Sequence, residues 1–382
     1  MERMKLSYFW RSPPAFWCRL IIAFFAAILF RYPFFLFQLD AGSLQSVGLW
    51  NQDFKLMCDW DCGIYSVLSE NYEPSSSAFF PLFPFLIRFF HLLIPSLSAK
   101  AAALAVSSIF TILCGILLLF FDEIFIGKVK AQKFFGFSRN SWLLLLSVSI
   151  FPSGHFWMRG YSESVFVTLL VCILYCIRYK KWIWAAPLLG LISVLRPQGI
   201  WVLGLALGYL ITSHFSLMSE KKSSPSPWGL VVGVSLISII PLSLFMGWLW
   251  LKTGNPLYFY TLQSSGWGRS FDFISGLKAH LPKFESSSLF LYLSLFAAYR
   301  FMKREENHWK FLGAVTFALA DLPLFIGGHY SYVRFMSANL GLFVLISELM
   351  AENTGWRTAI IIWSTAKLAV QTYHAGFGLW AG

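Results

Sequence analysis

A series of apolar runs, each about twenty residues long, constrains this chain more than any other feature. An α-helix rises about 1.5 Å per residue, so such a run spans the roughly 30 Å hydrocarbon core of a bilayer. Only 13% of the 382 residues are charged, about half the share in soluble domains, and 57% are hydrophobic. The chain has too much apolar bulk to stay unfolded in water. The pattern predicts an all-α polytopic membrane protein.

We expect about eleven transmembrane helices in a single domain, residues 1–382. The predicted spans are 15–38, 99–121, 141–157, 163–178, 182–196, 199–213, 229–251, 288–302, 310–327, 333–350 and 357–374. The first run is long and lacks a small-residue cleavage site, so we interpret it as a span and not as a signal peptide. The stretch 79–95 is apolar but contains Pro81, Pro84 and Arg88, so we expect it to lie at the membrane interface.

Basic residues predict the orientation, because they collect in cytoplasmic loops. With the N-terminus inside, most Lys and Arg residues fall in inner loops or at inner span ends. Two long outer loops result, residues 39–98 with the interfacial segment and residues 252–287. Within the first, residues 39–78 contain six acidic side chains and one lysine. Loops this long in a compact membrane protein usually carry function.

The first outer loop contains two carboxylates, Asp59 and Asp61, on either side of Trp60. A carboxylate at a membrane surface can act as a general base, although an ordinary solvated acidic loop has the same composition. The Asp-x-Asp spacing also occurs in the metal sites of nucleotide-sugar glycosyltransferases. Nucleotide sugars are not normally supplied on the outer side, so we predict neither a metal nor a cofactor here.

The two cysteines that flank these carboxylates, Cys58 and Cys62, are one helical turn apart. They either form a disulfide, which an oxidising compartment would permit, or remain buried free thiols. No cysteine spacing in the chain resembles a zinc site.

Further polar side chains gather at the predicted outer ends of spans: Glu163, Arg196, Gln198 and Arg334. Ionisable residues at membrane depth are costly, and they are usually paired or functional. A guanidinium suits a phosphate because it donates two parallel hydrogen bonds and stays charged. The arginines could equally anchor span ends or pair with Glu163. Together with the acidic loop, they indicate a site for a phosphorylated lipid and a hydroxyl acceptor.

These motifs resemble, in chain order, those of the PIG-V-like mannosyltransferases. The matching stretches are Trp60-Asp61-x-Gly63-x-Tyr65, Glu70-Asn71-Tyr72, the string AFFPLFP at 78–84, Phe151-Pro152-Ser153, Tyr161-Ser162-Glu163-Ser164, Arg196-Pro197-Gln198-Gly199, Thr253-Gly254-Asn255-Pro256-Leu257, Gln263, Trp267-Gly268 and Arg334-Phe335. The sequence departs from the family at Ile64, where many members have His, and at Asn255, where the family has Asp.

The resemblance implies a GT-C fold and an inverting, metal-independent glycosyltransferase. The donor would be a polyprenyl-phosphate-linked hexose, typically mannose, and the acceptor a glycolipid hydroxyl. In eukaryotic members this reaction adds mannose during glycosylphosphatidylinositol assembly in the endoplasmic reticulum. We expect a bacterial-type member in the inner membrane, with an extracytoplasmic active site, membrane lipids around it and no nucleic acid partner.

The resemblance also implies roles for individual residues. Asp61 is expected to be the catalytic base, with Asp59 as the alternative, and Arg196 and Arg334 are expected to bind the donor phosphate. The expected substrate-binding residues are Trp60, Tyr65, Glu163, Gln198, Gln263 and Trp267.

Two other functions would also suit a chain with many spans. A lipid or glycolipid transporter explains the spans and basic inner loops equally well, but it does not require a long acidic outer loop with Trp-Asp, and it usually places charges near the bilayer midplane. A structural membrane subunit explains the family-like strings least well.

Overall fold

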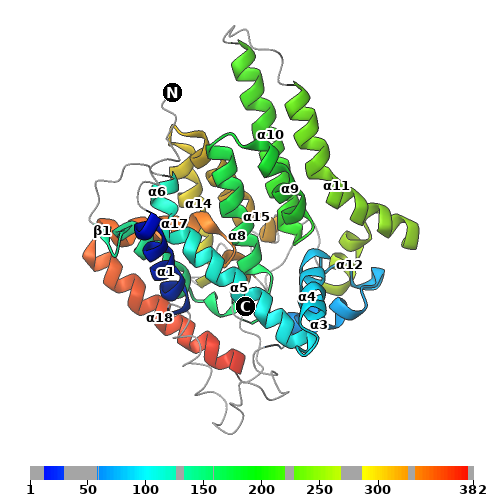
Figure 1. Ribbon diagram of the computed structural model, residues 1–382, viewed down its shortest axis with the longest axis horizontal. Coiled ribbons are helices and arrows are strands. Elements are labelled where there is room, and N and C mark those ends of the chain that lie inside the picture. Colours follow the sequence, from blue (N-terminus) through cyan, green and yellow to red (C-terminus); the bar gives the residue numbers. More distant parts are fainter. Residues whose placement is uncertain are drawn as a thin grey trace.

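A computed structural model describes the chain at residues 13–29, 58, 60–125, 133–157, 159–219, 228–267, 286–325 and 332–376. These residues form an all-helical fold (Figure 1), in which the only strands are the antiparallel two-residue pieces β1 (Lys133–Phe134) and β2 (Phe137–Ser138). The α-helices are α1 (Pro13–Leu29), α3 (Asp61–Glu70), α4 (Leu82–Leu93), α5 (Ala99–Leu119), α6 (Phe121–Phe125), α7 (Arg139–Ser149), α8 (Glu163–Arg178), α9 (Trp182–Ser193), α10 (Pro197–Ser219), α11 (Trp228–Thr253), α12 (Tyr258–Trp267), α14 (Ser286–Met302), α15 (Asn307–Phe325), α16 (Tyr332–Met336), α17 (Leu340–Glu352) and α18 (Thr354–Gly376). Two short 3₁₀ helices are η4 (Pro74–Ser76) and η5 (Gly154–Trp157).

Short connections turn neighbours in sequence into neighbours in space. Helices α8 and α9, α9 and α10, α14 and α15, and α17 and α18 pack directly on each other. Pro197 is the first residue of α10. Proline suits the first turn of a helix but disfavours helical backbone in the residue before it, so the chain turns at Arg196. The turns bring the beginnings of α8 and α10 to the same end of the bundle.

Helices α5 and α8 run in the same direction and are joined by small polar side chains. Ser164 Oγ donates to the carbonyl of Ser107 at 3.1 Å, and Thr168 Oγ1 donates to that of Phe110 at 3.1 Å. The backbone N–H of Gly160 donates to Ser107 Oγ at 3.2 Å. Small side chains let helix backbones approach closely in a membrane. These contacts fix the chain immediately before α8.

Helices α5 and α11 are long and apolar enough to cross a bilayer, with 21 and 26 residues and mean hydropathies of 2.5 and 2.3. Shorter apolar helices lie within α1, α4, α9 and α14. Large apolar side chains of α11 are exposed, including Leu236, Ile240, Leu244, Trp250 and Leu251. An exposed apolar surface of this kind marks contact with lipid or with another protein. The architecture is consistent with a helical membrane protein.

The predicted interfacial segment contains α4, which has two different faces. Phe83 and Ile87 are fully buried, whereas Phe85 and Phe89 are each 55% exposed. A helix with one buried and one exposed apolar face can pack on the protein with the first and contact lipid with the second. Figure 1 shows α3, α4 and α12 gathered at the end of the bundle opposite the beginning of α11.

One predicted span, 333–350, is divided into two helices. Helix α16 ends at Met336, and Asn339 caps the next helix by accepting the backbone N–H of Leu342 on its side-chain oxygen at 3.4 Å. Average hydropathy cannot detect such a break, because a single hydrogen-bonding side chain causes it. Arg334 therefore lies in a separate short helix, α16. The predicted span 141–157 is also shorter, since α7 ends at Ser149.

Charged side chains form two groups at opposite ends of the helices. One group lies where α5, α8, α14 and α17 end and where α1 and α15 begin. It includes the ion pairs of Arg19 with Glu123 at 2.6 Å, Arg304 with Glu348 at 2.5 Å and Arg300 with Glu352 at 3.3 Å. Arg178 lies beside them and contacts the ring of His308 at 2.9 Å. The other group lies where α3, α8 and α10 begin. The predicted orientation places the first group inside and the second outside.

This orientation predicts how single cysteines introduced at Ser75 and Glu305 will react. Both residues are exposed in the structure, Ser75 in η4 and Glu305 between α14 and α15. In a background with Cys18→Ser, a membrane-impermeant maleimide added to intact cells should label Ser75→Cys and leave Glu305→Cys unlabelled. Both sites should react after the membrane is permeabilised. Labelling of only Glu305→Cys in intact cells would reverse the orientation.

Candidate active site

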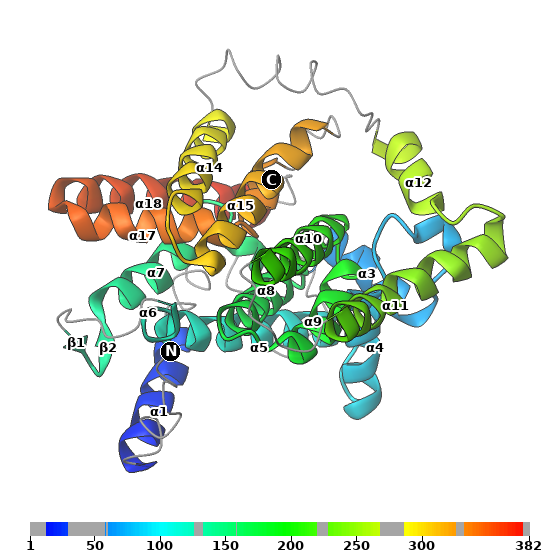
Figure 2. The ribbon, with the colours of Figure 1, turned by 90° about the horizontal axis from the view of Figure 1, so that it is seen from above.

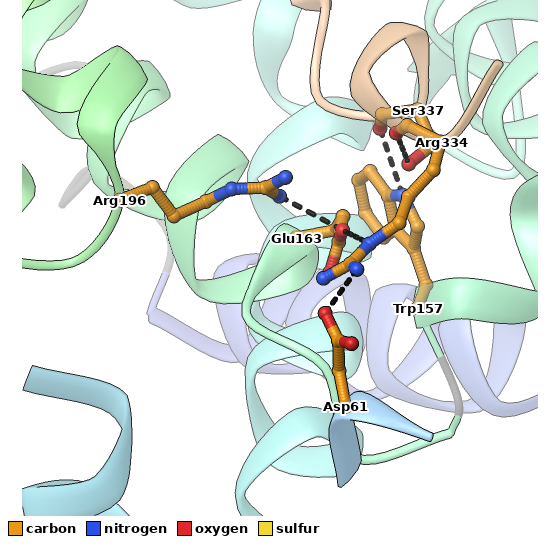
Figure 3. A network of polar contacts seen from close by, with 6 residues as sticks. All are labelled: Asp61, Trp157, Glu163, Arg196, Arg334 and Ser337. Atoms are coloured by element: carbon orange, nitrogen blue, oxygen red, sulfur yellow. Dashed lines mark hydrogen bonds and ion pairs between the residues drawn. The ribbon is translucent and has the colours of Figure 1, made fainter. Parts of the chain in front are cut away.

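Four charged side chains, three from the helices α3, α8 and α16 and one from the turn before α10, meet at the end of the bundle where α3, α8 and α10 begin (Figure 3). Glu163, the first residue of α8, accepts a hydrogen bond from Arg334 Nε at 2.6 Å and forms an ion pair with Arg196 Nη1 at 2.9 Å; both arginines contact its Oε1 atom. Arg334 also pairs through Nη1 with Oδ2 of Asp61, the first residue of α3. Arg334 therefore bridges the two carboxylates.

These side chains differ in their access to solvent. The side chains of Glu163, Arg196 and Arg334 are 0%, 5% and 6% exposed, whereas that of Asp61 is 20% exposed. A buried ion is costly unless it is paired, so Glu163 and the two arginines depend on one another. Asp61 is the carboxylate that a substrate can reach. The network thus combines a buried, fixed part with one accessible carboxylate.

Gly199 makes the turn that brings Arg196 into the network. A Cβ at this position would lie 1.7 Å from the carbonyl oxygen of Ile192, near the end of α9. The N–H of Gly199 donates to the carbonyl of Arg196 at 2.9 Å, which closes the turn. Only a residue without a side chain allows α10 to begin so close to α9. This accounts physically for the Arg-x-x-Gly spacing.

Aromatic rings surround the two guanidinium groups. Arg334 lies 4.5 Å from the ring centre of Tyr161 and 5.5 Å from that of Phe156, and Arg196 lies 5.8 Å from that of Phe335. Guanidinium groups are attracted to the faces of aromatic rings at such distances. The rings therefore hold the arginines in place while excluding water.

Two tyrosine hydroxyls belong to the same region. Tyr65 packs its ring against Phe79 and Phe83, at centroid distances of 5.4 Å and 4.9 Å. Burial raises the pKa of Tyr65, although the charge of Arg334 acts in the opposite direction, and the pKa of Tyr161 is raised for the same reason. Both hydroxyls therefore stay protonated at neutral pH.

The structure brings together Asp61, Glu163, Arg196 and Arg334 from the set predicted from sequence, with Tyr65 beside them. Gln198 is buried, at 6% exposure, and its Oε1 has no hydrogen-bond partner among the described residues. The side-chain amide of Gln263 instead donates to the carbonyl of Ala78 at 3.0 Å, which ties α12 to the first outer loop.

The remaining predicted residues lie at the edge of what the structure describes. Trp60 precedes α3 and is 50% exposed, so its ring is accessible to a substrate. Asp59 and the side chain of Trp267 lie outside the described residues. Their predicted roles stay predictions.

Sequence reasoning missed two residues that support Arg334, Trp157 and Ser337, and two further residues that are buried nearby. Trp157 Nε1 donates to the carbonyl of Ser337 at 2.9 Å, and Ser337 Oγ donates to the carbonyl of Arg334 at 2.5 Å. His155 and Arg159 are also buried in the segment before α8. All except Ser337 lie between the family-like strings at 151–153 and 161–164, and that proximity is the signal that could have identified them.

Among the residues that the structure describes, no three or more His, Cys, Asp or Glu side chains form a group that could hold a metal ion. The two carboxylates of the network are instead engaged by arginines. Any phosphate bound here would meet guanidinium groups.

Comparisons with protein-family models, with curated proteins and with solved structures found no significant match.

Replacing Glu163 should destabilise the whole fold. Glu163→Gln removes the charge that pairs with Arg196 and Arg334, and breaking a buried ion pair in this way costs about 3–5 kcal/mol. The matched control is Glu348→Gln, because Glu348 also pairs with two arginines, but its side chain is 18% exposed and those of Arg304 and Arg300 are 27% and 31% exposed. For these partly exposed pairs we expect a loss of about 1 kcal/mol or less each. Thermal unfolding of the purified protein would compare the two variants, and equal losses would contradict the analysis.

Gly199→Ala should damage the site through the backbone. The added methyl group collides with the Ile192 carbonyl, and such overpacking costs about 1–3 kcal/mol or more. Gly204→Ala is the control in the same helix, because a Cβ there has no heavy atom within 4 Å. In a helix interior this second change should be neutral or stabilising, since Ala has the higher helix propensity. Unfolding temperatures in the same detergent would test the difference.

Proposed function

We propose that this protein is a membrane glycosyltransferase of the GT-C fold. It transfers a hexose, by resemblance mannose, from a polyprenyl-phosphate-linked donor to a hydroxyl group of a glycolipid acceptor, with inversion and without a metal. The observation that carries the proposal is the accessible carboxylate of Asp61, which pairs with the buried Arg334 and through it joins Glu163 and Arg196. General-base attack and departure of a phosphate need a carboxylate and a cationic group within one site.

In the proposed reaction Asp61 accepts the proton of the acceptor hydroxyl. The oxygen attacks the anomeric carbon from the face opposite the phosphate, the glycosidic bond forms, and the bond to the phosphate breaks with its electron pair on the leaving oxygen. Arg196 and Arg334 stabilise the charge that develops on that phosphate. Arg334 therefore both stabilises the leaving phosphate and holds the base, Asp61.

The aromatic residues would bind the sugar or the prenyl chain. The half-exposed Trp60 immediately precedes Asp61, and aromatic rings provide flat apolar surfaces that suit a sugar ring. The protonated hydroxyl of Tyr65 can donate to a sugar or phosphate oxygen. Gln198 has a free buried acceptor, as described above, and can receive a sugar hydroxyl.

We propose an extracytoplasmic site in a multi-pass protein, and a bacterial inner membrane as its location. Cys58 and Cys62, which flank Asp61, form a disulfide in the structure. Disulfides persist in oxidising compartments such as the periplasm and are rare in the cytosol. This supports the orientation that the basic residues predict.

Asp61→Asn should abolish transfer without unfolding the protein. Asn keeps the shape of the side chain but cannot act as the base, and such a loss typically lowers a rate about 100- to 10,000-fold. The assay is transfer of label from radiolabelled polyprenyl-phosphate-mannose to extracted membrane lipids by purified protein in lipid. Donor binding should persist.

Asp59→Asn is the matched control, because it makes the same change two residues away and should reduce the rate less. Equal activity of Asp61→Asn and the unmodified protein, at equal abundance, would remove Asp61 as the base. A transporter would yield no labelled lipid product with any variant, and it would give no reason to rank the two aspartates.

A further inference from the structure

The disulfide between Cys58 and Cys62 encloses the residue on which the proposed reaction depends. The bond closes a loop of five residues that ends in Asp61-Cys62, at the beginning of α3. The carbonyl of Trp60, inside this loop, accepts the N–H of Ile64 at 3.1 Å and so begins the hydrogen bonding of the helix. Cross-linking here fixes where α3 begins, and with it the position of the Asp61 side chain.

The backbone inside the loop has an uncommon conformation. Trp60 has φ of 54°, in the left-handed region that residues with bulky side chains rarely adopt. Such a conformation persists only where the surrounding structure imposes it, and it is found preferentially at functional sites. The covalent closure on either side of Trp60 supplies that constraint. Next to this constrained residue, the side chain of Asp61 pairs with Arg334.

Cys62 also packs against the segment that leads to Glu163. A Cβ on Gly160 would lie 2.4 Å from Cys62 Sγ, and Gly160 itself has φ of 72°. Cys62 is fully buried and Cys58 is 1% exposed. The disulfide therefore lies between α3 and the chain before α8, so that it sets the distance between the two carboxylates that share Arg334.

The structure assigns to the Cys58–Cys62 disulfide the role of a positioning element for the base, which rests on the function proposed above. The bond does not touch the substrate. It acts through Asp61 by holding the carboxylate at Arg334, where attack on the donor takes place. Its burial among packed atoms marks it as a permanent part of the site, because thiol exchange requires access to a sulfur atom.

A second pair, Cys172 and Cys176, provides a matched control. It has the same spacing of four residues, but both thiols are free in the structure and lie in α8. Changing both members of either pair to serine replaces two sulfur atoms by oxygen, but only at Cys58 and Cys62 does it also remove a covalent bond. Only the Cys58–Cys62 pair should affect the position of Asp61.

The test uses the full-length protein in lipid with Cys58→Ser/Cys62→Ser. A misplacement of about 1 Å can lower a rate about 100-fold, so we expect kcat to fall about 10- to 100-fold while KM for the donor changes less than about twofold. Cys172→Ser/Cys176→Ser should keep kcat within about twofold. Alkylation of the denatured, unreduced protein should modify the four cysteines that are free in the structure. Modification of all six, or an unchanged kcat in Cys58→Ser/Cys62→Ser, would overturn the inference.

A second measurement does not need activity, so it separates this inference from the proposed function. Asp61→Asn should lower the unfolding temperature of the parent by weakening the contact with Arg334. In the Cys58→Ser/Cys62→Ser background the same change should have a clearly smaller effect, because Asp61 is no longer held at Arg334. Equal shifts in both backgrounds would overturn the positioning role. If no variant transfers sugar but the shifts differ, the proposed function fails and the positioning role stands.

Discussion

Glu163 is the centre on which the candidate site depends. Its carboxylate is completely buried at the beginning of α8, and one of its oxygens contacts guanidinium groups that arrive from two other parts of the chain. None of the three ions would be stable there alone, because removing a charge from water costs several kcal/mol per ion. The arginines are therefore held by the same carboxylate that they neutralise. As a result, the beginning of α8, the turn after α9 and the short helix α16 are joined at Glu163.

Several backbone features bring the charged groups together around Glu163. Gly199 lets α10 begin against the end of α9, and the break at Asn339 separates α16 from α17. The hydrogen bonds from α8 to α5 fix the approach to Glu163. Each feature is local, yet each determines where one charged group stands. The site is rigid because several independent helix ends meet there, which is the support that a catalytic group needs.

Much of the helical organisation could be predicted from hydropathy, since α5, α8 and α11 lie close to their predicted ranges. Where polar side chains set the ends of helices, prediction was poorer: the divided span at 333–350 follows from one asparagine cap. The candidate site could be predicted as a set of residues, but their pairing could not. Whether Arg196 would pair with Glu163 or remain apart depends on a turn that Gly199 makes possible, and no average over a window contains that information.

The disulfide shows a different limit. The spacing of Cys58 and Cys62 was compatible with a bond or with free thiols, because four residues of separation do not determine whether the chain is helical there. In the structure α3 begins inside the pair, so Cys58 lies outside the helix and its sulfur can reach Cys62. The decisive fact is a helix boundary, and boundaries are the part of a fold that sequence patterns define least well.

The sharing of Arg334 has a consequence for the order of events in the proposed reaction. A polyprenyl-phosphate sugar is a phosphodiester with a single negative charge, and it leaves as a monoester that gains a second one. When Asp61 takes the proton of the acceptor, it loses its own charge and attracts Arg334 less strongly. At the same moment the phosphate gains negative charge, which Arg334 can stabilise. Glu163 keeps Arg334 in place through this exchange, because its contact is with Nε while Asp61 contacts Nη1. Without moving, Arg334 can thus neutralise Asp61 before the proton transfer and the phosphate after its bond to the sugar breaks. Proton transfer and bond cleavage therefore favour each other.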